Sequence, residues 1–139
     1  MKRVHKFLRL PSADRRLLVE TVLILAAIRL ALRILPFRWL CRLLPCRSRA
    51  LKPPSTDRLI ASVKSASYYN PGATCLARAV TLHILMTRAG YESCVRIGFA
   101  PDGGTLSGHA WLEVGTRIAF GGPDVARYSP LLSIEGACK

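Results

Sequence analysis

The sequence has no paired cysteine motif, although it contains five cysteines in 139 residues. They are Cys41, Cys46, Cys75, Cys94 and Cys138, an odd number with no regular spacing and no CxxC pair. Cys41 and Cys46 lack the further pair of His or Cys residues that a structural zinc site requires. This pattern argues against a zinc module, and we expect neither a metal ion nor a cofactor. Because no cleavable signal peptide is visible, we expect a cytoplasmic protein with reduced thiols.

Long uninterrupted apolar runs are also missing. The stretch at residues 17–35 is interrupted by Glu20, Arg29 and Arg33, and its longest uncharged segment is residues 21–28. A membrane-spanning helix needs about 20 consecutive apolar residues, and charges at the depth of the bilayer centre are costly. The stretch therefore predicts a buried or interfacial helix.

Acidic residues are scarce in the first third of the chain. Residues 1–52 contain 13 Lys and Arg against two acidic residues, a net charge of +11, whereas residues 53–139 contain eight against six, a net charge of +2. A basic segment binds nucleic acid, an anionic membrane surface or an acidic protein partner. Only Phe7, Phe37 and Trp39 accompany the basic residues, without a recognised motif, which argues against nucleic acid. An anionic membrane surface and an acidic protein both stay open as partners. A cytoplasmic protein that associates peripherally with a membrane is therefore one possibility.

The hydrophobic content of 50% is sufficient for a packed core. We divide the chain into a basic N-terminal helical region, residues 1–52, and a main domain, residues 53–139. In the first region, apolar residues recur every three or four positions over residues 17–35, which predicts a helix that ends at Pro36. Residues 37–44 predict a second short helix, and residues 47–54 a linker.

Two smaller expectations concern the first helix. Ser12 or Asp14 is the expected N-cap, because short polar side chains accept hydrogen bonds from the first free N–H groups. Arg29 and Arg33 are four residues apart and are expected on a solvated face.

In the main domain the periodicity changes from helical to alternating. Helices are predicted at residues 56–67 and 74–89, separated by a turn at residues 68–72 and followed by Gly90 as a C-terminal cap. Alternating residues then predict strands at 94–99, 109–114 and 117–120, with turns at 101–104 and 115–116. The fold class is therefore α+β, with N-terminal helices preceding a helix packed on an antiparallel sheet.

Two residues form a candidate catalytic pair. Cys75 lies in the first turn of a predicted helix, where free N–H groups and the helix dipole favour a thiolate and stabilise an oxyanion. His109 lies in a later strand, which is the order that a papain- or transglutaminase-like nucleophile requires. We expect Cys94 and Cys138 to be structural, His83 to lie in the core or on the surface, and His5 to be solvated.

Several segments together resemble a known family. They are residues 71–79 (PGATCLARA), 88–90 (RAG), 108–113 (GHAWLE) and 122–131 (GPDVARYSPL), with residues 10–18 and 35–37 near the start. This combination resembles the leader peptidases of lasso-peptide biosynthesis, which are transglutaminase-like cysteine proteases of bacterial peptide maturation. The resemblance implies a papain/transglutaminase-like core with Cys75 as nucleophile and His109 as base.

The resemblance also implies partners. The peptidase removes the leader from a ribosomally made precursor, and an asparagine-synthetase-like cyclase then closes the ring. Residues 1–52 are too short and too helical to be the mostly β leader-recognition module, so we expect a separate leader-recognition protein. The basic helices are candidates for docking that protein, the cyclase or a membrane exporter, and a solvated scaffold is the alternative.

The third catalytic residue of the family pattern is missing from its usual place. The pattern has an Asp about a dozen positions after the His, where this chain has Gly121. Asp124 follows closely and is our candidate, if the chain curls at residues 121–123. Three alternatives stay open: an acyltransferase of the same fold, a catalytically degenerate docking subunit, and a basic membrane-surface protein.

Overall fold

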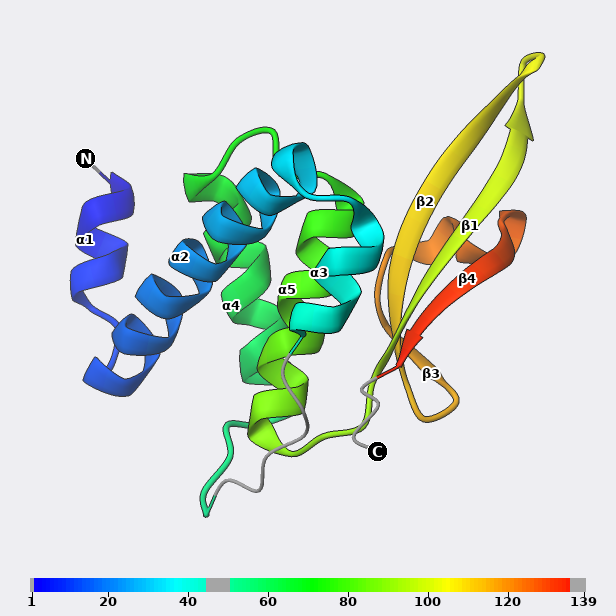
Figure 1. Cartoon of the computed structure of the whole chain (residues 1–139). Coiled ribbons are helices and arrows are strands. Elements are labelled where there is room, and N and C mark those ends of the chain that lie inside the picture. The colour runs from blue at the N-terminus through cyan, green and yellow to red at the C-terminus, as the bar shows by residue number, and fades with distance from the viewer. Residues whose placement is uncertain (1, 45–50, 136–139) are drawn as a thin grey trace.

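The computed structural model describes residues 2–44 and 51–135. Over these residues the chain forms five α-helices, one 3-10 helix and a four-stranded antiparallel sheet, which confirms the predicted α+β class (Figure 1). The elements in chain order are α1 (Lys2–Leu8), α2 (Ser12–Ile34), α3 (Phe37–Leu43), α4 (Thr56–Tyr69), α5 (Cys75–Ala89), β1 (Cys94–Asp102), β2 (Thr105–Val114), β3 (Arg117–Phe120), η1 (Pro123–Arg127) and β4 (Ser129–Glu135).

Helix α5 is the centre of the molecule. It packs against α2 and α4 on one side and against β1 and β2 on the other, so that it lies between two layers (Figure 1). Eleven of its 15 residues are buried, which matches the predicted run of apolar residues. Thr74 caps its N-terminus by accepting a hydrogen bond from the Ala77 N–H at 3.2 Å. Gly90, with φ of 90°, ends the helix in the left-handed conformation that favours glycine.

Helix α2 forms as the periodicity predicts and ends before Pro36. Its inner face carries Leu18, Leu25 and Ile28, which join the same hydrophobic core as α4 and α5. The expected N-cap is wrong, because Ser12 is already helical and no side chain caps the helix. Asp14 instead forms an ion pair with Arg58 of α4.

Helix α4 begins at a capping Ser55, whose side chain accepts a hydrogen bond from the Arg58 N–H. It extends two residues beyond the predicted end, because Tyr68 and Tyr69 continue the helix up to Asn70 and Pro71. The predictions for Cys46, Cys138 and the first half of the linker, residues 47–50, lie outside the described residues.

The strands follow the order β3-β2-β1-β4. The β1–β2 hairpin turns at Gly103 and Gly104, which have φ of 54° and 88°, so the strand continues through Pro101 where the sequence predicts a turn. β4 pairs with β1 only as far as Phe99, so the edge of β1 that faces β4 is unpaired at Pro101. Proline has no N–H to donate and is therefore tolerated at this edge position. The edge strand β4 was not predicted; it pairs antiparallel with β1.

The two faces of β2 have different roles. Ala110 and Leu112 belong to the core that covers α5, whereas His109, Trp111 and Glu113 alternate with them and face the other way. The sheet thus buries one face under the helices and carries the polar and aromatic groups of β2 on the opposite face.

Candidate active site

Cys75 is the first residue of α5 and is partly exposed. The first N–H groups of an α-helix have no acceptor within the helix, so those at the start of α5 are available to a negatively charged group. The predicted arrangement of a cysteine at a helix N-terminus is therefore present, and it follows from Thr74 starting the helix one residue earlier.

Helix α2 supports the loop that leads to Cys75. The Arg29 Nη1 donates a hydrogen bond of 2.8 Å to the Oδ1 of the buried Asn70. The Ala73 N–H in turn donates to the carbonyl oxygen of Asn70. Gly72, with φ of 88°, lies so close to the Arg29 guanidinium that a Cβ would be 3.0 Å from Nη2. Arg29 is therefore not on a purely solvated face, as the sequence suggested, but braces the loop.

A cavity of about 480 Å³, which we call the Cys75 pocket, is lined by both Cys75 and His109. Lys64 of α4 and Arg78 of α5 add positive charge to its wall. The remaining lining residues are Ala110, Ile118, Ala119, Phe120, Gly121 and Gly122. The structure thus brings the two predicted catalytic residues to one cavity whose charged lining residues are both cations.

The His109 ring is held by three contacts. Its Nε2 lies 2.7 Å from the carbonyl oxygen of Gly121, and its ring centroid lies 5.0 Å from that of Tyr128 and 6.4 Å from that of Trp111. A carbonyl oxygen can only accept a hydrogen bond, so Nε2 carries the proton. The Nδ1 of the neutral ring is therefore left with a lone pair, as a general base requires.

Within the described residues, the Cys75 thiol and the His109 ring are not hydrogen-bonded to each other. Both line the Cys75 pocket, although the His109 side chain alternates with the core residues Ala110 and Leu112 along β2, and the hydrogen bond of His109 goes to the Gly121 carbonyl oxygen. In cysteine and serine hydrolases the hydrogen bonds of the catalytic groups are often long before substrate binds and shorten in the complex.

The backbone at Gly121 explains why no Asp occupies this place. Gly121 has φ of 139°, a region that side chains rarely adopt, and a Cβ there would lie 2.4 Å from the Cβ of Trp111. Asp124 lies in η1 and is exposed, and it is not among the residues that line the Cys75 pocket. The chain does curl at Gly121 and Gly122, but the curl presents a carbonyl oxygen to His109 and leaves the Asp124 carboxylate outside the pocket.

Comparison of the amino-acid sequence with known families identifies the family of this chain. The family model of the transglutaminase-like superfamily matches residues 22–133. The chain belongs to the transglutaminase-like superfamily. No curated protein and no solved structure matches it. The matched residues run from α2 to β4, so this transglutaminase-like domain includes Cys75, His109 and the helix that braces the loop before Cys75.

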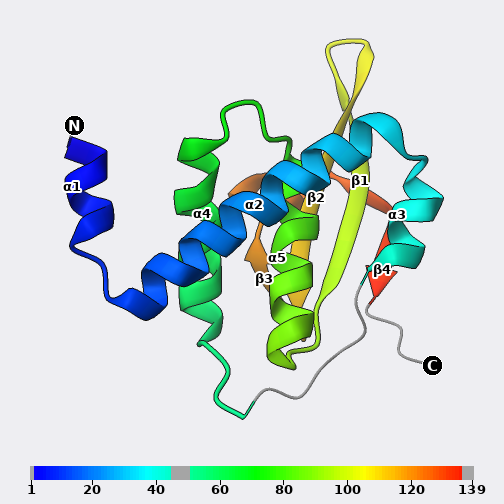
Figure 2. The same ribbon diagram turned by 60° about the vertical axis from the view of Figure 1, so that its left-hand side comes forward.

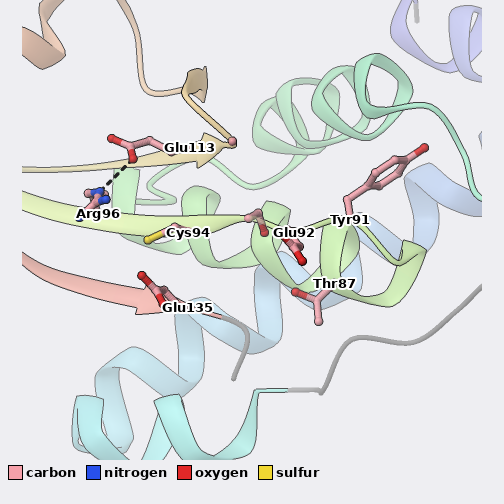
Figure 3. Close-up of a pocket in the computed structure, with 9 residues that line it drawn as sticks. Thr87, Tyr91, Glu92, Cys94, Arg96, Glu113 and Glu135 are labelled. Carbon is pink, nitrogen blue, oxygen red and sulfur yellow. Dashed lines mark hydrogen bonds and ion pairs between the residues drawn. The ribbon is translucent and has the colours of Figure 1, made fainter. Parts of the chain in front are cut away.

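A second cavity of the transglutaminase-like domain contains a different cysteine. This Cys94 pocket, of about 340 Å³, lies where β1 begins and is lined by Cys94, Arg96 and three carboxylates, those of Glu92, Glu113 and Glu135 (Figure 3). No histidine is among its lining residues. Burial raises the pKa of the Cys94 thiol, which disfavours the thiolate. Both observations argue against Cys94 as the nucleophile of the domain.

Glu113 is engaged within the Cys94 pocket. It accepts a hydrogen bond of 2.9 Å from the Arg96 Nε (Figure 3). It also accepts one of 3.0 Å from the Trp111 Nε1. Burial by itself raises the pKa of Glu113, but these two hydrogen bonds and the positive charge of Arg96 together hold the pKa below its usual value. Glu113 shares the sheet face of His109, yet its carboxylate is committed to Arg96 and Trp111.

The other histidines lie away from the Cys75 pocket. His83 is buried within α5, where its Nδ1 lies 2.7 Å from the Ser93 hydroxyl and burial lowers its pKa. His5 is exposed on α1. Over residues 2–44 and 51–135, no group of three or more His, Cys, Asp or Glu is arranged to hold a metal ion. In the same residues, no helix is both long enough and apolar enough to cross a membrane.

Proposed function

We propose that this chain is a cysteine peptidase that removes the leader from a ribosomally made lasso-peptide precursor. The observation that carries the proposal is that Cys75, at the start of α5, and His109, on β2, line one cavity. The motifs around both residues support the narrower identity, since they resemble the leader peptidases within the superfamily. Cytoplasmic location is part of the same proposal.

The proposed reaction passes through a thioester. The His109 Nδ1 accepts the thiol proton of Cys75, and the sulfur attacks the scissile carbonyl carbon. The resulting oxyanion is stabilised by the free N–H groups at the start of α5. As the C–N bond breaks, the imidazolium donates its proton to the leaving amine of the core peptide, and the leader stays on Cys75. His109 then activates a water molecule that hydrolyses the thioester and releases the leader acid.

The carbonyl of Gly121 takes the positioning role in this proposal, and Asp124 does not. It holds the His109 ring in the tautomer that leaves Nδ1 free. A neutral carbonyl stabilises an imidazolium less than a carboxylate does, and loss of the acid in a triad can cost about 10⁴-fold in rate. We therefore expect a slow peptidase, which is adequate for an enzyme that cuts one bond in a dedicated precursor.

The charge of the Cys75 pocket favours a particular substrate. Lys64 and Arg78 are its charged lining residues, and the buried Nε of Arg78 has no hydrogen-bond partner among the described residues. Two cations in the wall of the pocket favour a carboxylate of the substrate as their partner. The precursor is expected to carry an acidic side chain close to the cut.

The proposed partners follow from the proposed reaction. A separate leader-recognition protein presents the precursor, and an asparagine-synthetase-like cyclase receives the released core. Neither nucleic acid nor a cofactor has a role in this scheme.

Mass spectrometry of the chain mixed with its precursor and recognition protein tests the proposal. We expect a leader fragment and a core peptide, both absent with Cys75→Ala and both present with the matched control Cys94→Ala. Cleavage that persists in Cys75→Ala contradicts the assignment. A product in which an added amine is joined to the leader, with no leader acid, points to an acyltransferase.

A second candidate function is a catalytically degenerate docking subunit. The observation that favours it is the same Gly121, whose backbone conformation and contact with Trp111 exclude the expected Asp. A folded chain that binds precursor and recognition protein, but releases no leader with either present, supports the docking subunit and contradicts the peptidase.

A further inference from the structure

Helix α2 is apolar on two opposite faces. Its inner face is buried in the core through Leu18, Leu25 and Ile28. On the outer side, four aliphatic residues that are 47–68% exposed form what we call the outer stripe: Val19, Leu23, Leu30 and Ile34. Their spacing of four, seven and four residues places them on one side of the helix. A contiguous exposed apolar patch marks a surface that contacts another molecule.

The outer stripe is on the face of the molecule that looks away from the sheet. In Figure 2, α2 lies in front of α4 and α5, and the sheet lies behind them. Helices α1 and α3 continue from the two ends of α2 (Figure 2). Nothing among the described residues therefore packs over the middle of the stripe.

Both neighbouring helices add exposed apolar side chains. Val4 of α1 lines an apolar hollow of about 280 Å³ together with Val19 and Leu23 of the stripe. Trp39 and Leu43 of α3 are also exposed, and the Arg42 guanidinium lies 5.5 Å from the centre of the Trp39 ring. A Trp beside an Arg is typical of side chains that lie at the interface of water and lipid.

The charges around the stripe are almost all positive. Residues 2–44 contain ten Lys and Arg and two acidic residues. Both acids are paired toward the body of the protein: Asp14 with Arg58 of α4, and Glu20 with Arg88 of α5 at 2.6 Å. By their position on the helix, Arg15, Arg16 and Arg33 flank the stripe, where long stems lie along an apolar surface while the cationic heads reach outward.

We propose that α1, α2 and α3 bind the surface of an anionic phospholipid bilayer, with the outer stripe against the acyl chains and the flanking arginines against the headgroup phosphates. An apolar stripe bordered by cations and a Trp fits this partner. A second copy of the chain is a poor occupant, because two surfaces of the same strong positive charge repel each other. The inference is independent of the peptidase activity.

Co-sedimentation with vesicles tests the proposal. We expect the full chain to sediment with vesicles of phosphatidylcholine and phosphatidylglycerol at low salt. Added salt should release it, because the ions screen the attraction between the arginines and the lipid phosphates. Vesicles of phosphatidylcholine alone, which carry no net charge, should not bind it. Of the two tryptophans, Trp39 is 53% exposed and Trp111 only 2%, so a blue shift of the emission on binding reports Trp39. Trp39→Phe should abolish that shift.

Two matched variants distinguish vesicle binding through the outer stripe from nonspecific hydrophobic binding. Leu23→Glu with Leu30→Glu should weaken vesicle binding about tenfold or more, because two carboxylates enter the lipid-facing side. Leu106→Glu with Leu131→Glu, at exposed positions of β2 and β4, should leave binding unchanged. Circular dichroism confirms that both variants fold.

Four results would overturn the proposal. The first is a folded chain that does not sediment with anionic vesicles at low salt. The second is vesicle binding that the stripe variant leaves unchanged. The third is a dimer that the stripe variant dissociates in the absence of any lipid binding, which makes a second copy the occupant. The fourth is a stable complex with an acidic protein that replaces lipid binding.

Discussion

The Nε2 of His109 lies 2.7 Å from the carbonyl oxygen of Gly121, where the family pattern predicts a carboxylate. This contact assigns the ring proton to Nε2 and leaves a lone pair on Nδ1 of the neutral ring. The contact depends on Trp111, whose side chain lies against both Gly121 and Gly98, at positions where a Cβ would come within 3 Å of it. The two glycines and the tryptophan thus form one structural unit behind the candidate base.

The first prediction concerns Gly121. Gly121→Ala should lower the free energy of unfolding by about 2–3 kcal/mol and slow cleavage, because a Cβ clashes with Trp111 and displaces the carbonyl from His109. Gly122→Ala is the matched control, since its φ is also positive but nothing lies near its Cβ position. Urea denaturation and cleavage rates measure both effects. Equal losses in the two variants would contradict the role of the Gly121–Trp111 contact.

The second prediction separates Asp124 from the catalytic pair. Asp124→Asn should change the cleavage rate less than about threefold, because its side chain is exposed and outside the pocket. His109→Ala should reduce cleavage to background. A loss of about 10⁴-fold in Asp124→Asn would instead assign it as the third catalytic residue.

The third prediction concerns the brace between α2 and the loop before Cys75. Arg29→Gln should lower the free energy of unfolding by about 1–3 kcal/mol, because the buried Asn70 loses its donor. It should also slow the alkylation of Cys75 by iodoacetamide, followed by peptide mapping. Arg33→Gln, one turn later on the same helix and exposed, is the control and should change neither. If Arg29→Gln is less stable but its Cys75 is alkylated at the same rate, Arg29 supports the fold and does not affect the reactivity of Cys75.

The fourth prediction is a dependence of stability on pH. Burial keeps the pKa of His83 below its ordinary value of 6.5, so the unfolded chain binds this proton more tightly than the folded protein. The free energy of unfolding should therefore be constant above about pH 7 and fall as the pH drops below 6.5, until both states are protonated. Glu113, whose pKa lies below its usual 4.5, contributes only at lower pH, where its stabilising charge is lost.

Urea denaturation between about pH 5 and 8 measures this dependence. His83→Gln, which can still bond to the Ser93 hydroxyl but does not titrate, should flatten the curve. His5→Gln, at an exposed position, should not. A curve that keeps its slope in His83→Gln would assign the pH dependence to another group.

The fifth prediction concerns the substrate. Arg78→Glu should raise the KM for a precursor with an acidic residue near the cut, and exchange of that residue for Lys should restore binding. Arg127→Glu, exposed on η1 and outside the pocket, is the control. If the precursor with Lys does not restore binding to Arg78→Glu, the proposed selection of a substrate carboxylate is contradicted.

Local chemistry is what made most of the fold predictable. The start of α5 depends on Thr74, its end on Gly90, and its core face on a continuous apolar run, and all three are visible in the sequence. The long-range relations were not predictable. Three such relations join separate segments of the chain. They are the pairing of β4 with β1, the hydrogen bond from Arg29 to Asn70, and the contacts of the Trp111 side chain with Gly98 and Gly121. The assignment of Cys75 and His109 as catalytic stays a prediction, with their shared pocket as its structural support.

Intact-mass spectrometry of the acyl-enzyme tests the central claim most directly. When the chain is mixed with precursor and recognition protein and quenched early in acid, we expect a species heavier by the mass of the leader acyl group, mapped to Cys75 and reversed by hydroxylamine. An adduct on another cysteine, or release of the core peptide without any adduct on Cys75 at any time, would contradict the proposed thioester mechanism.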